Sequence, residues 1–363
     1  MKIGFFLGGM FSNGGIGRVT SILCNQLVKD PSMEITSIFY AGSDNPLLYE
    51  LNLRVKRENL FPRVIPMKNA FVNRGVKRLR DLVLANDLDV LVACGSLFYP
   101  LAILACKKTR VKCVCWEHTA PNITTDHAFQ MQSRIFGARR SAANVLITRA
   151  AKEEYDNKIA RKGNNLTIYN PIDEKAVAAA REYNKASHKI ISVGRLTYQK
   201  NYEQLLSVAN KVLSKHSDWA WDIYGEGEQR DQLTEIINGY GMEKRITLKG
   251  QVSDIYDRYG DYSFMVLLSL YEGFPMTLLE ASANGLPMVS FDVKTGPNEI
   301  IDHGENGYLL PFGDEDAAAN AIEALIMSEE KRVAMSVASK QSAERFKLNE
   351  IAAQWNDLFN SLK

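Results

Sequence analysis

Two carboxylates stand eight residues apart in a segment that changes character between them. Glu272 is followed by Gly-Phe-Pro, and Glu280 lies in the helix-forming run that comes next. The apolar run 264–269 before it is typical of a buried strand, and proline is favoured where a helix begins. A helix start offers unpaired backbone N–H groups that attract phosphate. The segment therefore predicts a site for a ligand with both phosphate and sugar hydroxyls, as in a nucleotide sugar.

The C-terminal half holds a pair of cations at the end of another predicted strand. Arg195 and Lys200 follow the apolar run 189–193 and precede a predicted helix at 203–214. Two cations at one strand end are suited to a diphosphate, because a guanidinium binds phosphate oxygens through parallel hydrogen bonds. A solvated basic loop is the alternative interpretation.

Two further junctions in this half place glycine after a predicted strand. Gly225 and Glu226 follow one strand, and Gly250 and Val252 follow the next. Glycine lets the backbone approach a nucleoside closely. Each motif alone is equally explained by a turn or a helix cap.

Two segments of the N-terminal half carry candidate ligands as well. Gly14 and Gly15 lie in a glycine-rich turn after the first strand, where backbone N–H groups can approach phosphate. The turn lacks the GxGxxG spacing of dinucleotide-binding folds. His118 ends the predicted strand 112–116, where an imidazole can bind a sugar hydroxyl or transfer a proton. A flexible loop and a purely structural histidine are the alternatives.

Strand-like apolar runs alternate with helix-like segments along the whole chain, which predicts parallel sheets covered by helices on both faces. The alternation stops in a polar stretch at about 174–188 and then restarts. We therefore expect two doubly wound, Rossmann-like α/β domains, at 1–175 and 186–346, and a final helix at about 347–363 that returns to the first domain. Ligands of such sheets bind at the carboxyl ends of the strands, so two facing sheets predict a deep cleft.

The composition is that of an ordinary globular protein, with 363 residues, 46% of them hydrophobic and 24% charged. No apolar run reaches the roughly 20 residues of a membrane-spanning helix, and the first residues predict a buried strand rather than a signal peptide. The five cysteines form no paired CxxC sets. We expect buried thiols in a reducing cytoplasm, and neither a metal site nor a cofactor.

Charge is divided unevenly along the chain. Residues 1–185 carry a net charge of +11 and residues 186–363 a net charge of −9. Nine basic residues lie between Arg54 and Arg80, interleaved with apolar residues such as Phe61. This pattern is typical of a surface that binds anionic lipid. A solvated basic face is the alternative, and no nucleic acid partner is expected, because no nucleic-acid-binding module is recognisable.

Together, these motifs resemble the retaining glycosyltransferases of family 4, which have the GT-B fold. The resemblance covers both predicted domains and is strongest over 189–312. It depends on the order and spacing of four motifs, which are Gly194-Arg195…Lys200-Asn201, Gly225-Glu226-Gly227, Glu272-Gly-Phe-Pro…Glu280-Ala and Gly285-Leu-Pro287.

The resemblance implies a role for each candidate residue. Glu272 would approach the transferred sugar, Arg195 and Lys200 would neutralise the leaving diphosphate without a metal, and His118 would lie near the acceptor. Glu280 would bind the ribose. The other donor-binding residues would come from the glycine-containing turns, and they are Gly14, Gly15, Gly225, Glu226, Gly250, Val252, Gly273, Phe274 and Pro275.

The resemblance also implies the reaction. A hexose would pass from a nucleotide sugar, expected to be uridine-linked, to a saccharide or lipid-linked saccharide in cell-surface polysaccharide synthesis. The enzyme would work in the cytoplasm, with Arg54–Arg80 holding it to the inner face of the membrane. One alternative is a GT-B protein that binds sugar nucleotides without transferring them, which the intact set of charged site residues argues against. A GT-B epimerase is the other, but no signature such as a cofactor lysine is present.

Overall fold

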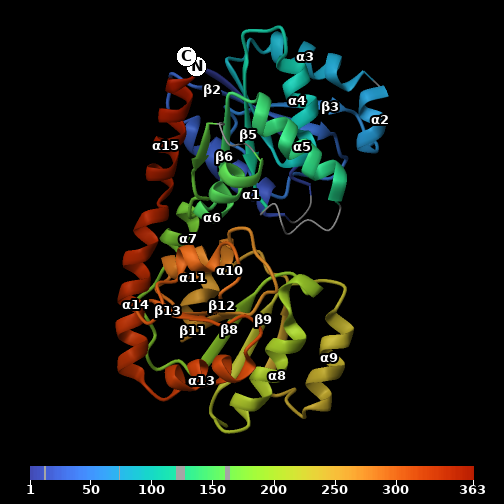
Figure 1. Cartoon of the computed structure of the whole chain (residues 1–363). Coiled ribbons are helices and arrows are strands. Elements are labelled where there is room, and N and C mark those ends of the chain that lie inside the picture. Colours follow the sequence, from blue (N-terminus) through green and yellow to red (C-terminus); the bar gives the residue numbers. More distant parts are fainter. Residues whose placement is uncertain (12–13, 73, 120–126, 160–163) are drawn as a thin grey trace. The chain divides into compact units, whose positions relative to one another are not determined.

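The computed structural model describes residues 1–11, 14–72, 74–119, 127–159 and 164–363. They divide into two compact units (Figure 1). The first unit comprises Met1–Pro171 and Leu348–Lys363, and the second comprises Ile172–Lys347. The polar stretch at 174–188 lies inside the second unit and begins with the short helix α7 (Glu174–Ala178).

The first unit is built on a seven-stranded parallel sheet with the order β3-β2-β1-β4-β5-β6-β7. Its strands are β1 (Lys2–Leu7), β2 (Glu34–Ala41), β3 (Lys56–Phe61), β4 (Val90–Cys94), β5 (Lys112–Glu117), β6 (Ala143–Leu146) and β7 (Asn165–Thr167). The central strand β4 is buried along its whole length, as expected where helices cover both faces of a sheet.

Helices pack on both faces of this sheet, and successive residues of β1 show how. Phe6 belongs to a core that includes residues of α3 and α4, whereas the ring of Phe5 meets Trp355 of α15 at 6.3 Å. Neighbouring strand residues point to opposite faces, so α3 and α4 cover one face and α15, which packs beside α1, covers the other. The helices of this unit are α1 (Gly15–Leu27), α2 (Met67–Val72), α3 (Gly75–Ala85), α4 (Tyr99–Cys106), α5 (His127–Arg140), α6 (Arg149–Glu154) and α15 (Leu348–Ser361).

The second unit is built on a six-stranded parallel sheet with the order β10-β9-β8-β11-β12-β13. Its strands are β8 (Lys189–Val193), β9 (Ala220–Tyr224), β10 (Ile246–Gly250), β11 (Phe264–Leu267), β12 (Met288–Phe291) and β13 (Gly307–Leu310). Two doubly wound sheets confirm the fold class predicted from the alternation of apolar runs.

Helix α8 (Tyr202–Leu213) of the second unit buries one apolar stripe. On α8 the buried positions Leu205, Val208, Ala209 and Val212 follow the three- and four-residue spacing of a helix face. Besides α7, the helices are α8 (Tyr202–Leu213), α9 (Arg230–Gly239), α10 (Ile255–Arg258), α11 (Met276–Ala283), α12 (Pro297–Ile300), α13 (Glu315–Ile326) and α14 (Glu329–Ala343).

Each sheet reverses its strand order once, between β1 and β4 in the first unit and between β8 and β11 in the second. The loops that leave two such strands diverge to opposite faces, and ligands of doubly wound sheets bind in the crevice between them. This geometry directs attention to the loops that follow β8 and β11.

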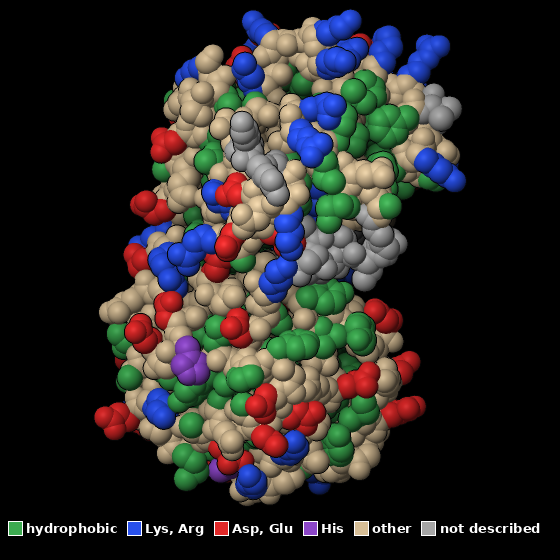
Figure 2. Space-filling model, in the orientation of Figure 1, with side chains coloured by type: hydrophobic (Ala, Val, Ile, Leu, Met, Phe, Trp, Pro, Cys, Tyr) green, Lys and Arg blue, Asp and Glu red, His purple; other side chains and the backbone are tan. Residues whose placement is uncertain are grey.

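The basic stretch from Arg54 to Arg80 folds as the edge strand β3 and the helices α2 and α3. Its Lys and Arg side chains gather over this part of the first unit, whereas Asp and Glu side chains are spread over the second (Figure 2). The expectation that Phe61 contributes to the exposed apolar surface is wrong, because Phe61 is buried at the end of β3 in the core beneath α3. Among the described residues of this stretch, Val64 and Phe71 are large apolar side chains that are exposed.

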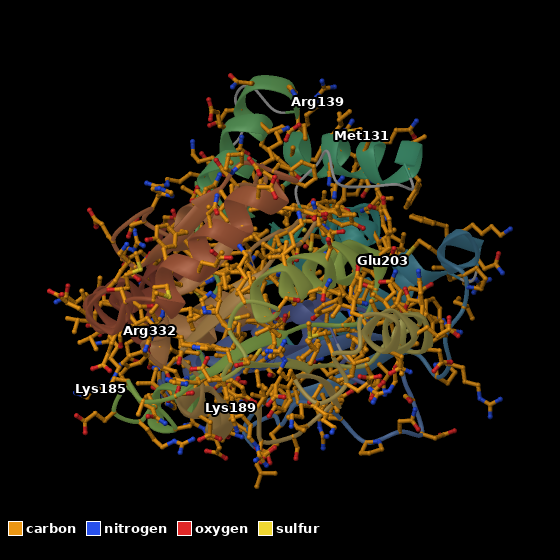
Figure 3. All side chains as sticks on the ribbon, turned by 90° about the horizontal axis from the view of Figure 1, so that it is seen from below. Met131, Arg139, Lys185, Lys189, Glu203 and Arg332 are labelled. Atoms are coloured by element: carbon orange, nitrogen blue, oxygen red, sulfur yellow. The ribbon has the colours of Figure 1, made fainter. Side chains whose placement is uncertain are left out.

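Arg332 at the start of α14 joins three segments of the second unit. It lies beside Lys185 in Figure 3, and its Nη2 donates to the carbonyl of Lys185 at 3.2 Å. Its Nη1 donates to the carbonyls of Leu325 and Ile326, which end α13. The guanidinium also lies 5.3 Å from the ring centre of Trp219. A buried arginine thus caps one helix and anchors the loop before β8.

Two expectations from composition have structural counterparts. All five cysteines are buried free thiols, and burial raises the pKa of Cys24 to about 12. Within the described ranges, no helix has the length and apolar character needed to cross a bilayer.

Candidate active site

Lys200 and Glu272 meet where the sheet of the second unit reverses its strand order. Lys200 ends a 3₁₀ turn after β8, and its Nζ lies 2.5 Å from Oε1 of Glu272 in the loop after β11. The two side chains are only 12% and 6% exposed. The loops are also joined by backbone, since Leu270 N donates to the Gln199 carbonyl at 2.9 Å. The predicted cation and carboxylate are thus brought together and shielded from water.

The turn that follows Glu272 is fixed by the loop after β12. The hydroxyl of Thr295 donates to the backbone carbonyl of Glu272 at 2.5 Å. Gly296 packs so closely on this turn that a Cβ there would lie 2.8 Å from the carbonyl oxygen of Gly273 and from Cδ of Pro275. Glu272 is therefore held at both ends, by Lys200 through its side chain and by Thr295 through its backbone.

Phe274 and Pro275 complete the turn into α11. Phe274 is buried, with its ring 5.5 Å from that of Phe346. Pro275 stands immediately before α11 rather than in its first turn, and none of the described side chains caps this helix start. The first backbone N–H groups of α11 therefore follow Glu272 by four residues in the chain, and an uncapped helix start of this kind is suited to a phosphate.

Glu280 lies on α11 and is 1% exposed. Its Oε2 accepts a hydrogen bond from the hydroxyl of Tyr259 at 2.7 Å. Tyr259 begins a 3₁₀ turn before β11 and is itself fully buried. The second predicted carboxylate is therefore held by a buried phenol.

The glycine-containing loops after β8, β9 and β10 form one continuous row. Gly194 N donates to the Tyr224 carbonyl and Gly225 N to the Gly250 carbonyl, both at 2.9 Å. A Cβ on Gly225 would lie 1.9 Å from the carbonyl oxygen of Gly194, and one on Gly227 2.2 Å from that of Leu196. The backbones can pair only because these positions carry no side chain.

The remaining predicted residues of this unit lie in or just after the loops that follow β8, β9 and β10. None of these described residues makes a hydrogen bond or ion pair with the buried Lys200–Glu272 pair. Glu226 makes an ion pair with Arg230 at 2.8 Å, and its Oε1 lies next to Gly250. Val252 is half-buried just beyond β10. Arg195 is exposed and has no ion-pair partner in the part of the chain that the structure describes.

In the first unit, His118 follows β5 and is buried against the ring of Trp116, with ring centres 4.3 Å apart. Its Nε2 has no hydrogen-bond partner among the described residues. Burial lowers the pKa of His118 to about 3. The histidine is therefore neutral near pH 7, able to accept or donate one hydrogen bond but not to supply a positive charge.

The residue before His118 was not predicted to matter, yet it is the centre of a buried network. Glu117 Oε2 accepts from Arg134 Nε at 2.8 Å and from the Tyr155 hydroxyl at 3.0 Å. Glu117 Oε1 accepts from the N–H and hydroxyl of Thr119. Burial, then the charge of Glu117, holds the pKa of Tyr155 well above its usual range. This network fixes the residues on both sides of His118.

Gly14 and Gly15 stand where the sequence predicted a turn, at the start of α1. Gly14 N donates to the hydroxyl of Tyr49 at 3.1 Å, and neither glycine has a neighbour that a Cβ would meet. Asn13, which belongs to the same motif, lies outside the described residues. One N–H expected to face phosphate is thus occupied by a phenol oxygen.

Sequence reasoning missed Tyr259, Thr295 and Glu117, and the signals available for them differ. Thr295 lies within 189–312, where the family resemblance is strongest, and Glu117 adjoins a predicted site residue. Nothing about Tyr259 in the sequence points to Glu280. Among the described residues, no three or more His, Cys, Asp or Glu side chains are grouped to hold a metal ion.

Two parallel Rossmann-like sheets, with charged loops at the strand order reversal of the second, are the architecture of the GT-B fold. The model described as "Glycosyltransferase Family 4" matches residues 13–176, and "Glycosyl transferases group 1" matches residues 174–342. The chain belongs to these GT-B glycosyltransferases, because the two models between them account for both units.

Individual proteins of this kind match over nearly the full length. The chain is 27% identical to the amylovoran biosynthesis glycosyltransferase AmsD of Erwinia amylovora, covering 99% of both chains. It is 26% identical to an uncharacterised glycosyltransferase of Haemophilus influenzae, covering 98% of this chain and 99% of the other. The crystal structure of Staphylococcus aureus TarM with fondaparinux, α-GlcNAc-glycerol and UDP superposes with a TM-score of 0.82 at 15% identity, covering 99% of each chain.

Proposed function

We propose that this glycosyltransferase moves a hexose from a UDP-sugar to a saccharide or lipid-linked saccharide in cell-surface polysaccharide synthesis, with retention of anomeric configuration. The observation that carries the proposal is the buried Lys200–Glu272 pair at the strand order reversal of the second unit. The amylovoran role of AmsD supports the class of product, and the UDP in the TarM complex supports the nucleotide.

The site chemistry follows from where charge develops. Breaking the bond between the anomeric carbon and the diphosphate oxygen leaves negative charge on the diphosphate and positive charge on the sugar. Lys200, which is shielded from water, and Arg195, which is exposed beside it in the chain, stabilise the leaving diphosphate. Cations placed at a leaving group stabilise a transition state strongly. The acceptor hydroxyl attacks from the face that the diphosphate leaves, and its proton passes to a leaving phosphate oxygen. Protein cations thus take the part that a metal plays in other transferases.

Glu272 and Glu280 have different parts in this proposal. Glu272 lies beside the leaving-group cation, so it contacts the transferred sugar rather than acting as a covalent nucleophile. Glu280, eight residues further along the chain and within α11, binds the ribose hydroxyls. A pair of glycosidase carboxylates would instead both flank the scissile bond, and the contacts of Glu280 with Tyr259 and of Glu272 with Lys200 separate the two carboxylates by role.

The donor is identified by thermal shift with a panel of nucleotide sugars, because a ligand at 100 times its Kd stabilises a protein by about 2.7 kcal/mol. Lys200→Ala should then lower kcat, and Glu280→Ala should mainly weaken donor binding. Lys211→Ala on α8 is the control, because Lys211 pairs with Glu315 and Asp316 of α13 and with neither site carboxylate. Wild-type kinetics in both site variants would refute the assignment.

Retention and metal independence have their own measurements. The anomeric configuration of product made from an α-linked donor, read by NMR coupling constants, should remain α. Activity should survive treatment with EDTA. A β-linked product would exclude retention, and loss of turnover that Mg²⁺ or Mn²⁺ restores would exclude a metal-independent mechanism.

The basic surface of the first unit supports a peripheral position on the inner face of the membrane. Eight of its nine cations are exposed. Arg80 is the exception, because its guanidinium donates to the carbonyls of Leu104 and Ala105. Each exposed cation contributes about 1 kcal/mol near an anionic bilayer. Binding to phosphatidylglycerol vesicles should therefore weaken with salt and with charge reversal at Arg74, Lys77 and Arg78. If the charge-reversal variant binds the vesicles as well as the wild type does, membrane binding through this surface is refuted and the surface is a solvated basic face.

A further inference from the structure

We propose that Tyr259 is a positioning residue for nucleotide recognition, which acts by holding the Glu280 carboxylate in the orientation that accepts the ribose hydroxyls. This inference rests on the proposed role of Glu280. The observation behind it is the hydrogen bond of 2.7 Å from the Tyr259 hydroxyl to Glu280 Oε2, between two side chains that are 0% and 1% exposed.

The bond is strong enough to orient a carboxylate. A hydrogen bond to an ionised oxygen is shorter and stronger than one between neutral groups, and burial removes the water that would compete with it. A carboxylate can rotate about its final bond, because that torsion has a broad energy profile. A donor fixed on one oxygen restricts this rotation, so the second oxygen has a defined direction as well.

The two residues that follow Tyr259 in its turn are held by side chains from elsewhere in the unit. Gly260, the next residue, packs against the guanidinium of Arg181, and a Cβ there would lie 2.8 Å from its Nε. The same guanidinium donates to Asp261 Oδ1 at 2.9 Å. The hydroxyl of Ser187 donates to the Asp261 carbonyl at 2.7 Å. The Tyr259 side chain therefore extends from an anchored turn, so its hydroxyl can hold the Glu280 carboxylate of α11 in place.

The hydroxyl of Tyr259 is committed to Glu280 Oε2. In this proposal a nucleotide therefore senses the phenol through Glu280. This distinguishes Tyr259 from a binding residue. Loss of its hydroxyl should change how well the protein recognises the ribose hydroxyls and should leave recognition of the rest of the nucleotide intact.

The test compares UDP with 2′,3′-dideoxy-UDP by isothermal titration calorimetry on the full chain. The wild type should bind UDP roughly tenfold more tightly, since hydrogen bonds to a charged group are lost with the hydroxyls. Glu280→Gln should lose most of that preference. Tyr259→Phe should lower the affinity for UDP by about three- to tenfold and leave the affinity for dideoxy-UDP unchanged.

Tyr183→Phe is the matched control. The hydroxyl of Tyr183 donates to the backbone carbonyl of Ser263 at 2.7 Å, in the same unit and next to β11, but it touches neither carboxylate. This variant should bind both nucleotides as the wild type does. Unfolding midpoints of both tyrosine variants show whether either has lost its fold.

The outcomes separate the two proposals. If the wild type binds UDP and dideoxy-UDP equally, the role of Glu280 is overturned and this inference with it. The same holds if the wild type binds none of UDP, ADP, GDP and their 2′,3′-dideoxy forms. A wild type that discriminates while Tyr259→Phe discriminates equally well would overturn the role of Tyr259 alone. Equal weakening of both nucleotides in Tyr259→Phe would assign the tyrosine a purely structural part.

Discussion

The ammonium of Lys200 lies 2.5 Å from a carboxylate oxygen of Glu272, and the sequence separates these residues by 72 positions. The contact joins the loops after β8 and β11, which leave neighbouring strands where the sheet order reverses. Burial of both partners makes the pair a structural element as well as a part of the proposed site.

Breaking this pair should cost stability as well as activity. Lys200→Met leaves the buried carboxylate of Glu272 without its cation, which costs about 3–5 kcal/mol in the free energy of unfolding. The double variant Lys200→Met/Glu272→Gln should recover most of this loss in urea unfolding, because no charge is then stranded. It should recover no transfer activity. A double variant as unstable as the single one would show that the pair contributes no coupling.

Thr295 should act on turnover through the backbone of Glu272. Thr295→Val keeps the shape of the side chain and removes its hydroxyl, which costs about 1 kcal/mol in stability and, by releasing the turn, roughly ten- to a hundredfold in kcat. Thr295→Ser should restore both. Ser290→Ala, which removes a buried hydroxyl bond to the Leu267 carbonyl, should lose similar stability without the loss of kcat. Equal losses of kcat in the Val and Ala variants would remove the special role of Thr295.

Arg134→Met should destabilise the first unit severely. Arg134 and Glu117 are 0% and 2% exposed, so removing the guanidinium strands a buried carboxylate at a cost of about 3–5 kcal/mol. Lys77→Met is the control, because the Lys77–Asp81 pair is exposed and contributes little. Urea denaturation monitored by circular dichroism measures both. A small effect at Arg134 would mean that the phenols of Tyr99 and Tyr155 stabilise Glu117 sufficiently alone.

His118 should make the stability of the protein fall in mild acid. Its pKa is about 3 in the folded protein, below the ordinary value of about 6.5 in an unfolded chain. The unfolded state therefore binds more protons as pH falls below 6.5. The contribution of neutral His118 to the free energy of unfolding is complete above pH 6.5 and decreases as the pH falls toward 3. At pH 5 the protein has lost about 2 kcal/mol of this stability.

The comparison that checks this pH effect is between the wild type and His118→Gln. Unfolding in urea at pH 7 and pH 5 should show a smaller decrease for the glutamine variant, by about 2 kcal/mol. Parallel decreases would mean that His118 is protonated in the folded protein at pH 5.

Strand alternation predicted both sheets because buried parallel strands are apolar along their length, as Val90–Cys94 shows. The edge strand Lys56–Phe61 escaped prediction because only its last two residues are buried. The interpretation of the same basic sequence as an exposed surface holds for eight of its nine cations and is wrong for Phe61.

The candidate residues of the second unit were predictable by type and by strand end, but their partners were not. Lys200 was expected to face a diphosphate, and its contact with Glu272 depends on a loop 72 residues away. Tyr259 and Thr295 act through hydrogen bonds that only the folded chain creates. Local pattern indicates which residues are polar at a strand end; tertiary packing decides which atoms they meet.

The backbone pairing of the loops after β8 and β9 has a consequence for protein engineering. A side chain on Gly225 or Gly227 would collide with Gly194 or Leu196 and displace the loop that carries Arg195. The two loops therefore behave as one exchangeable cassette. A chimera that imports the β9 loop of another transferase to change its nucleotide must import the β8 loop with it, whereas Gly239 on α9, with open space around it, offers a point where libraries can vary freely.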